Sequence, residues 1–515
     1  MFDFADKLIL GFATCLQIVW MTDPVFGITW PIPTNLLLCF MGCLIGTLIG
    51  VLPGVGPIAT IAMLLPITYG LPPVGALIML AGIYYGAQYG GSTTAILVNI
   101  PGEATSVVTT LDGHQMARQG RAGSALAIAA IGSFIAGTIA TLVIAAIGQP
   151  MTRLALLFGP ADYFSLMVLG LRFAVVLARG SVPKAIAMIV VGIMLSTVGV
   201  DLETGDERLT FGWSEISDGI DFAVIAMGLF GFAAILKNLE NPEARDVVQG
   251  KIGRLMVSRE EFRQSFAPIM RGTFVGSILG ILPGNGAVLG PFASYTLEKK
   301  IAADPSRFGK GAIEGVAGPE SANNAGAQTA FIPLLTLGIP PNAVMALMLG
   351  AMTLKNIVPG PEVITKQPAL FWGMIASMWI GNLMLLIINL PLIGLWVRLL
   401  RVPYRLLFPA IVVFCCIGIY SIGNNPLDIY LAAVFGLVGY ALIKLGFEPA
   451  PLLLGFVLGR LMEEKLRQAL AISRGKFMTF IEEPLSLGFL IVGAILIIIA
   501  LLPAIRSSRE KVFVE

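Results

Sequence analysis

Neutral polar side chains gather at two places in otherwise apolar stretches of the chain. The segments GAQYGGSTTAILVNIPGE (86–103) and GPESANNAGAQTAFIPLLTLGIP (318–340) carry many hydroxyls and amides and few charges. Such groups can bind carboxylate oxygens or complete the oxygen shell of a sodium ion. They can equally form hydrogen bonds between packed membrane helices, so both interpretations stay open here.

Each polar segment follows a glycine- and proline-rich break. The first break, GVLPGVGP at 50–57, lies within a stretch from Pro24 to Gly102 that holds no Asp, Glu, Lys or Arg. A break at membrane depth frees backbone groups that need new partners. A helix that begins after the break offers N–H groups to an anion, and a helix that ends before it offers carbonyl oxygens to a cation.

The break occurs twice in the chain. Residues 42–56 (GCLIGTLIGVLPGVG) recur as 272–286 (GTFVGSILGILPGNG) at an offset of 230, and GGSTTAIL at 90–97 matches AGAQTAFI at 325–332 at an offset of 235. The sequence therefore predicts two related halves. Interrupted segments at corresponding positions of two repeats are typical of secondary transporters, in which broken helices meet at a site near the middle of the membrane.

The breaks and the polar segments together define a candidate site for substrate or a coupling cation. Glycines let a carboxylate approach bare N–H groups, and the polar segments add side-chain donors. Loss of one donor costs ~1–3 kcal/mol, so we expect Thr94→Val and Asn324→Leu to weaken uptake without lowering the amount of protein in the membrane. The candidate residues are Gly54, Gly56, Ser92, Thr93, Thr94, Asn99, Gly284, Asn285, Gly286, Asn323, Asn324 and Thr329.

Three charged residues stand in or beside apolar segments. Arg172 is an alternative anion-binding cation, although we expect it to face water or the membrane surface. Glu103 and Glu320 border the polar segments, where each is a candidate partner for a proton or cation and equally a candidate helix cap. The sequence leaves these roles open.

Composition predicts a protein that spans the membrane many times. Hydrophobic residues form 56% of the 515, charged residues 12%, and the mean hydropathy is +0.87. We expect an all-α fold with about ten to thirteen membrane segments, some broken or re-entrant, in two internal, inverted repeats. A net charge of +2 gives no reason to expect a nucleic-acid partner, and a single histidine, His114, argues against a histidine-ligated metal site or a histidine-based triad.

Charge asymmetry predicts the orientation of two loops. Residues 201–221 hold seven acids and one base, whereas 237–271 hold seven bases, so we place the first outside the cell and the second inside. The same rule fails to place the C-terminus, because basic clusters at 460–476 and 506–511 flank what looks like one span.

The chain divides into five expected parts on these grounds. They are an N-terminal interfacial or first helix (1–34), repeat 1 (35–200), an acidic loop with one span and a basic cytoplasmic linker (201–264), repeat 2 (265–446), and C-terminal membrane segments with a basic tail (447–515).

Missing motifs exclude some energy sources and reaction classes. The nearest approach to a P-loop, SRFGKGAIEG, lacks the spacing and the hydroxyl, so the sequence predicts no ATP hydrolysis of that kind. An integral-membrane enzyme acting on a lipid-like substrate is the alternative function, and it would need an acid/base or nucleophile set at one depth. A third possible function is that of a scaffold that anchors another transport subunit. We expect a transporter, not an enzyme, with no cofactor.

Several of these stretches together are similar to one known family. GTLIGVLPGVGP, the run from YYGAQYGGSTTAILVNIPGE through 123, GILPGNGA and EGVAGPESANNAGAQTAFIPLLTLGIPPNA resemble the large membrane subunit of the tripartite tricarboxylate transporters, over about residues 10–505. The resemblance implies a multi-pass protein of the bacterial inner membrane that imports citrate, dicarboxylates or aromatic acids by symport with Na⁺ or H⁺. It also implies two partners, a small membrane subunit of about four spans and a periplasmic solute-binding protein that delivers the carboxylate. We expect alternating access to carry the substrate inward.

Overall fold

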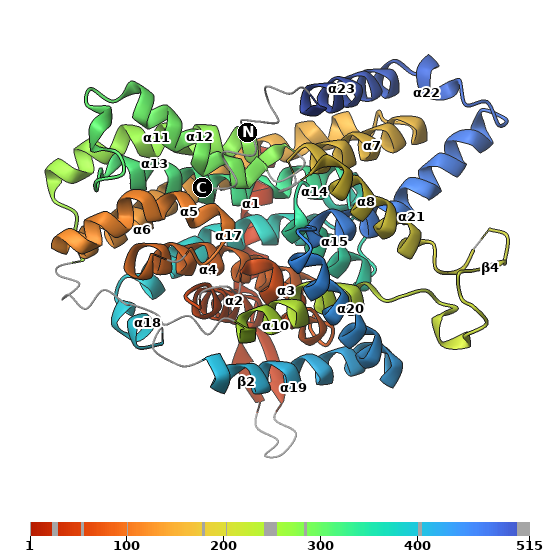
Figure 1. Cartoon of the computed structure of the whole chain (residues 1–515), viewed down its shortest axis with the longest axis horizontal. Helices are drawn as coiled ribbons and strands as arrows, with labels where there is room; N and C mark the ends of the chain where they lie inside the picture. Colours follow the sequence, from red (N-terminus) through yellow and green to blue (C-terminus); the bar gives the residue numbers. More distant parts are fainter. Residues whose placement is uncertain are drawn as a thin grey trace.

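The computed structural model describes residues 2–22, 29–52, 56–99, 101–177, 181–201, 203–240, 255–282, 286–399 and 404–501. Most of this described chain is helical, as expected for a helical membrane protein (Figure 1). Its two small sheets are hairpins in which β1 (Val19–Thr22) pairs with β2 (Thr29–Ile32) and β3 (Gly199–Val200) pairs with β4 (Glu207–Arg208).

The helices of the first half run up to the basic linker. They are α1 (Phe2–Leu16), α2 (Thr34–Gly50), α3 (Pro57–Thr68), α4 (Pro73–Val98), η1 (Ala104–Ser106), α5 (Val107–Thr109), η2 (Thr110–His114), η3 (Ala117–Arg121), α6 (Ala122–Ala155), α7 (Pro160–Leu177), α8 (Val182–Ser196), η4 (Ser214–Ile216), α9 (Phe222–Ala226), η5 (Met227–Phe232) and α10 (Ala233–Glu240).

The helices of the second half follow the linker. They are α11 (Arg259–Ile281), α12 (Gly286–Ile301), η6 (Pro305–Arg307), α13 (Glu314–Thr329), α14 (Phe331–Leu337), α15 (Ala343–Leu354), α16 (Pro361–Lys366), α17 (Pro368–Asn389), α18 (Ile393–Leu399), α19 (Tyr404–Gly423), α20 (Pro426–Lys444), α21 (Pro449–Ile472), α22 (Thr479–Glu482) and α23 (Pro484–Leu501).

Four helices in the described ranges are long and apolar enough to cross a membrane. They are Ala117–Ala155, Phe222–Glu240, Pro368–Asn389 and Pro426–Lys444. Shorter apolar helices include Thr34–Gly50, Pro57–Thr68, Val182–Ser196, Ala343–Leu354 and Pro484–Ile498. Together they indicate a multi-pass membrane protein. The count of ten to thirteen segments stays a prediction, because breaks divide several apolar runs into helices shorter than the ~20 residues that a span needs.

Both expected breaks interrupt helices. Helix α2 ends at Gly50 and α3 begins at Pro57, while α11 ends at Ile281 and α12 begins at Gly286. The residues between them at 53–55 and 283–285 lie outside the described ranges, so the mutual position of the two breaks stays a prediction.

Glycines spaced four residues apart make close helix contacts in each half. Gly42, Gly46 and Gly50 of α2 lie on Met79, Ile83 and Ala87 of α4, and Gly272, Gly276 and Gly280 of α11 lie on Gly318, Ala322 and Gly326 of α13. A Cβ added at Gly46 would stand 2.4 Å from the Ile83 carbonyl oxygen, and one added at Gly276 would stand 2.2 Å from that of Ala322. Only glycine therefore fits these positions without a backbone shift.

These contacts give a second relation between the halves beside the sequence match at 235. The partners of the glycines, for example Ile83 and Ala322, are separated by 239 residues, one helical turn more than the offset of 235. Asn99 and Gly338, also 239 apart, end their helices in the left-handed region at φ 59° and 72°. Thr94 and Thr329, which are 235 apart, lie against the corresponding glycines Gly50 and Gly280. The internal repeat and its offset therefore stay a prediction.

An ion-pair cluster places the acidic loop beside the C-terminal half of α21. The Arg467 guanidinium lies 2.6 Å from Asp201 Oδ2 and 2.8 Å from Glu203 Oε2, and Arg208 lies 2.8 Å from Glu463 Oε1. The loop and the 460–476 cluster thus lie on the same side. If the acidic loop is outside the cell, this basic cluster is outside as well, against the charge rule. The tail at 506–511 lies outside the described residues, so the side of the C-terminus stays open.

Candidate functional site

Helices α4 and α13 carry the polar segments and are buried along most of their length. The interior of α4 from Gly75 to Val98 and of α13 from Gly315 to Thr329 is shielded from solvent. Small residues allow neighbouring backbones to approach closely, and their hydroxyls and amides then find partners inside the protein. The first half and the second half of the chain meet here.

Glu320 of α13 accepts hydrogen bonds from the first half of the chain. Its side chain is fully buried, and Oε2 lies 2.5 Å from the Ser92 hydroxyl of α4. Its other oxygen, Oε1, accepts a hydrogen bond from the Thr109 hydroxyl of α5. Ser92 and Thr109 each donate their single O–H to this one carboxylate.

Glu103 forms a second carboxylate contact between the halves. It is the N-cap residue of η1, so the capping role considered from the sequence is present. Its Oε1 also accepts hydrogen bonds from Thr105 Oγ1 at 2.5 Å and from Asn323 Nδ2 of α13 at 3.3 Å. Gln88 of α4 contacts both Glu103 and Asn323 when its amide nitrogen is turned toward them. Glu103 therefore combines a capping position with a contact across the halves.

Both carboxylates have neutral partners. Among the residues that the structure describes, no lysine, arginine or histidine forms an ion pair with Glu103 or Glu320. A buried ionised carboxylate without a countercharge is destabilising by several kcal/mol. A bound proton or cation would relieve that cost, which makes an acid inside a membrane protein a candidate functional group.

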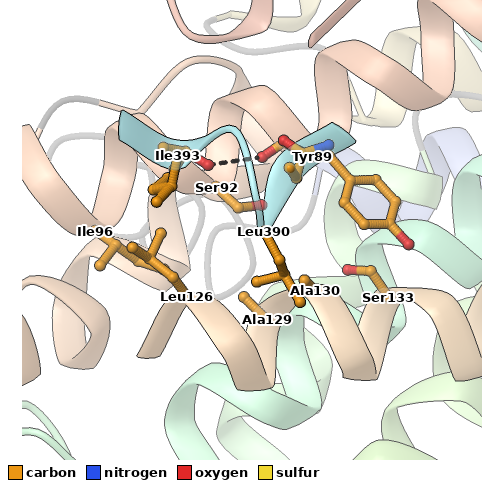
Figure 2. Close-up of a pocket in the computed structure, with 11 residues that line it drawn as sticks. Tyr89, Ser92, Ile96, Leu126, Ala129, Ala130, Ser133, Leu390 and Ile393 are labelled. Atoms are coloured by element: carbon orange, nitrogen blue, oxygen red, sulfur yellow. Dashed lines mark hydrogen bonds between the residues drawn. The ribbon is translucent and has the colours of Figure 1, made fainter. Parts of the chain in front are cut away.

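A small pocket of about 20 Å³, with room for about one water-sized group, lies beside Ser92 (Figure 2). Helices α4 and α6 and the chain from Asn389 to Ile393 form its wall. Figure 2 shows Ile96 and Leu126 at one end of the cavity and Tyr89 and Ser133 at the other. The lining residues are Tyr89, Ser92, Thr93, Ile96, Leu126, Ala129, Ala130, Ser133, Asn389, Leu390 and Ile393.

The polar lining of the cavity is only partly paired. Asn324 Nδ2 donates to Ser133 Oγ at 2.6 Å, which leaves the Ser133 O–H free to donate elsewhere. Asn389 is buried, and its Oδ1 has no hydrogen-bond partner in the described part of the chain. Buried acceptors are usually paired, so this oxygen would accept a hydrogen bond from a water molecule or another donor.

Four of the predicted site residues contact either the pocket beside Ser92 or the buried carboxylates. Ser92 and Thr93 line the cavity, Ser92 and Asn323 contact the buried carboxylates, and Asn324 holds Ser133 at the cavity wall. The sequence segments that supplied them therefore meet across the two halves.

Other predicted residues make contacts that favour a packing role. The Thr94 hydroxyl donates to the Val51 carbonyl at 3.0 Å, at the end of α2, and Thr329 lies against Gly280 at the end of α11. Asn99 is exposed and ends α4. Gly56 and Gly286 open α3 and α12, whereas Gly54, Gly284 and Asn285 lie outside the described residues.

Arg172 makes its contacts elsewhere. Its Nη1 donates to the Leu490 carbonyl of α23 at 3.1 Å, and the side chain lies against Gly493. Because its guanidinium bonds a backbone carbonyl of a neighbouring helix, its geometry gives no support for an anion-binding role.

Several polar residues in and around the site were not predicted. Tyr89 donates to Asn382 Oδ1 of α17 at 2.8 Å, and Asp112 accepts N–H groups from Gly311 and Ala312 at 2.7 and 2.8 Å, which fixes the start of α13. Because Tyr89 lies inside the first polar segment, the sequence could have identified it as a candidate site residue. Ser133 and Asn382 are isolated polar residues in apolar helices, a pattern that does not identify partners.

Comparison with known proteins gives matches along the chain. A family model described as "Tripartite tricarboxylate transporter TctA family" matches residues 36–454. A protein of Agrobacterium vitis described as "Uncharacterized 52.8 kDa protein in TAR-I ttuC' 3'region" is 59% identical over 515 residues, the full length of both chains. Another from the same organism, "Uncharacterized protein in TAR-II ttuC' 3'region", is 65% identical over 240 residues, 47% of this chain and 99% of its own length. No solved structure matches.

Proposed function

The chain belongs to the tripartite tricarboxylate transporter TctA family, and from this premise we propose that it imports tricarboxylates or related organic acids by cation-coupled symport. Within this proposal, a carboxylate group of the substrate binds at the pocket beside Ser92 and the coupling cation binds at the carboxylates Glu103 and Glu320. The observation that carries the assignment of the site is the Ser92–Glu320 contact, which joins a cavity wall to a buried acid without a cationic partner.

The two halves form inverted repeats in this proposal. Support comes from the matching glycine contacts of α2 and α11 and from a reciprocal pair of contacts between the halves. At the offset of 239, Asn323 corresponds to Tyr84, and Glu103 corresponds to Asn342. Asn323 donates to Glu103 at 3.3 Å, and by analogy Tyr84 and Asn342 are the corresponding pair of the other half. The backbones of Glu103 (φ −149°, ψ 170°) and Asn342 (φ −153°, ψ 174°) also agree.

Transport by alternating access follows from this arrangement. A site between two structurally similar halves can open to either side when one unit rocks against the other. An inside-negative potential opposes anion entry by ~2.3 kcal/mol per charge per 100 mV, so cations must at least offset the substrate charge. We expect net transport to be electroneutral or to carry positive charge inward.

Its partners in this proposal are those of a tripartite system. A small membrane subunit of about four spans completes the membrane complex, a periplasmic binding protein delivers the carboxylate, and the complex resides in the bacterial inner membrane. Nothing in the geometry favours the alternative enzyme on a lipid-like substrate.

Uptake by the reconstituted complex tests the function. Proteoliposomes that hold both membrane subunits, with the binding protein outside, should accumulate labelled citrate or succinate under an inward Na⁺ or H⁺ gradient. Uptake that persists unchanged after both gradients are collapsed would refute cation coupling. Liposomes without the large subunit provide the background value.

A further inference from the structure

The Ser92 hydroxyl belongs to both parts of the site. Its Oγ lies 2.5 Å from Glu320 Oε2 and 3.1 Å from the Gln88 carbonyl oxygen, while the side chain also lines the cavity (Figure 2). A serine hydroxyl has one proton to donate, although its oxygen can accept others. Ser92 therefore cannot donate to Glu320 and to a ligand in the cavity at the same time.

Building on the transport function proposed above, we infer that Ser92 is a hydrogen-bond relay through which protonation of Glu320 favours binding of a substrate carboxylate in the cavity. When Glu320 is ionised, it holds the Ser92 proton. When Glu320 takes a proton from solution, its own O–H donates to Ser92 Oγ, and the Ser92 O–H becomes free to donate to a substrate oxygen. The coupling ion at this position is a proton.

Reciprocity follows from this one shared hydrogen bond. If protonation of Glu320 strengthens anion binding by some factor, the bound anion strengthens proton binding by the same factor. Anion and proton then enter together, which is the coupling that an importer of anions needs against an inside-negative potential.

Of the described groups around Glu320, Ser92 and Thr109 are the ones that form hydrogen bonds with its carboxylate. Glu103 and Tyr89 are the titratable side chains that interact electrostatically with Glu320. Further from it, the packed elements carry Tyr84 and Tyr85 (α4), Asp112 and His114 (η2), Arg271 (α11), and Tyr295 and Glu298 (α12). Arg271 and Glu298 form two hydrogen bonds with each other, at 2.8 and 2.6 Å, and Asp112 is held by Tyr295 and backbone N–H groups. Neither pair supplies Glu320 with a countercharge.

The rest of the cavity wall suits a ligand that accepts hydrogen bonds. Ser133 is already an acceptor for Asn324, so its own O–H is available to the cavity. The unpaired Oδ1 of Asn389 is itself an acceptor, so it needs a donor and does not bind a carboxylate oxygen. Two hydroxyl donors, from Ser92 and Ser133, can then bind carboxylate oxygens once Glu320 is protonated.

Proton uptake on ligand binding tests the relay directly. When citrate or succinate is added to the complete wild-type complex in weakly buffered solution, the complex should take up about one proton per ligand bound. Its affinity for the ligand should rise on acidification by about five- to 150-fold.

Variants of the two relay residues test each part of the relay. Glu320→Gln should bind with an affinity that no longer depends on pH and without proton uptake, because its amide N–H replaces the carboxylic O–H as donor to Ser92. Ser92→Ala should bind weakly at every pH, whereas Ser92→Thr, which keeps the hydroxyl, should restore the pH dependence.

Two neighbouring variants separate the relay from a general loss of contacts. Ser133→Ala removes a cavity hydroxyl that does not touch Glu320, so affinity should fall at every pH and the pH dependence should remain. Thr109→Val removes a contact of Glu320 that does not line the cavity, so the dependence should move along the pH axis and remain. Melting temperatures of all variants in detergent identify any that fail to fold.

The outcomes distinguish the relay from the proposed function. If the wild type transports a carboxylate but takes up no proton on binding, or if Ser92→Ala retains the full pH dependence while folded, the relay is wrong and the import function stands. If the wild-type complex transports neither citrate nor succinate at any pH, the proposed function fails for these substrates, and the relay as stated fails with it.

Discussion

Two groups of carboxylates in this protein, one buried and one partly exposed, have opposite surroundings. In the inner carboxylate site, Glu103 and Glu320 accept hydrogen bonds from hydroxyls and an amide. In the outer ion-pair cluster, formed by Asp201, Glu203, Arg208, Glu463 and Arg467, each acid faces a guanidinium between 2.6 and 2.8 Å away. One group lies between α4 and α13, and the other joins the acidic loop to α21.

The difference indicates which acids are able to change charge. A guanidinium stays protonated at any physiological pH, so an acid beside it remains ionised and its charge is part of the structure. Hydroxyls and amides supply no compensating charge but accept a protonated acid as readily as they donate to an ionised one. Under the proposed function, the inner carboxylate site is therefore our candidate for coupling proton or cation binding to substrate, whereas the outer cluster joins the acidic loop to α21.

The largest expected effect comes from separating α13 from α11. Gly276→Leu would place side-chain atoms where a Cβ alone stands 2.2 Å from the Ala322 carbonyl oxygen, two residues from Glu320. Since backbone would have to move, we expect loss of folded protein from the membrane, measured by immunoblot and by thermal stability in detergent. Gly488→Leu is the control, because a Cβ at this exposed position of α23 meets nothing within 4 Å. Equal accumulation of the two variants would contradict the close contact.

The next effect concerns the neutral donors of the inner carboxylate site. Asn323→Leu removes the amide that reaches Glu103, and Asn324→Leu removes the one that holds Ser133. We expect each to lower uptake about five- to hundredfold, because a buried partner loses its hydrogen bond (~1–3 kcal/mol). Uptake is measured at equal amounts of membrane protein. Normal uptake in both variants would place the substrate and cation elsewhere.

Much of this architecture could be predicted from the sequence. The glycine spacing in α2 and α11 and the Leu-Pro-Gly strings are local patterns, and they identified both helix breaks. The acids were visible too, since Glu103 and Glu320 border the polar segments. The hydrogen-bond partners of these acids could not be predicted, because Ser92 and Glu320 are 228 residues apart and come into contact only when the two halves pack together.

The roles of individual residues were harder to predict, also for a physical reason. Thr94, Thr329 and Asn99 looked equivalent to Ser92 because hydroxyls and amides serve helix ends and ligand sites equally well. Sequence type therefore selected the right segments but could not separate binding residues from capping residues within them.

A smaller effect distinguishes two neighbouring threonines. The hydroxyl of Thr94 donates to the Val51 carbonyl at 3.0 Å, whereas that of Thr93 bonds within its own helix and lines the cavity. Contrary to the expectation from the sequence, we now expect Thr94→Val to lower stability by ~1 kcal/mol and to leave uptake per molecule near the wild-type value. Thr93→Val should show the reverse pattern. Melting temperature and uptake measured on the same preparations decide between them, and a transport defect in stable Thr94→Val would restore it to the site.

The smallest effect belongs to the outer ion-pair cluster and concerns acid. The backbone N–H of Glu203 and the Arg467 guanidinium lower the pKa of Asp201 to about 2, from its ordinary value of 3.8. Because the pKa of Asp201 is lower in the folded state, its contribution to stability is complete above the ordinary value and is lost as pH falls through the range from 3.8 to about 2.

The melting temperature of Asp201→Asn tests this contribution. The variant should have a slightly lower melting temperature than the wild type at neutral pH, and its melting temperature should decline less in that acidic range. High salt should weaken the wild-type contribution, since the cluster is partly exposed. Asp218→Asn, an exposed change in the same loop, is the control and should follow the wild type. If Asp201→Asn instead abolished the pH dependence of uptake near neutral pH, the outer cluster would take part in coupling, and the distinction between acids with guanidinium partners and acids with neutral partners would fail.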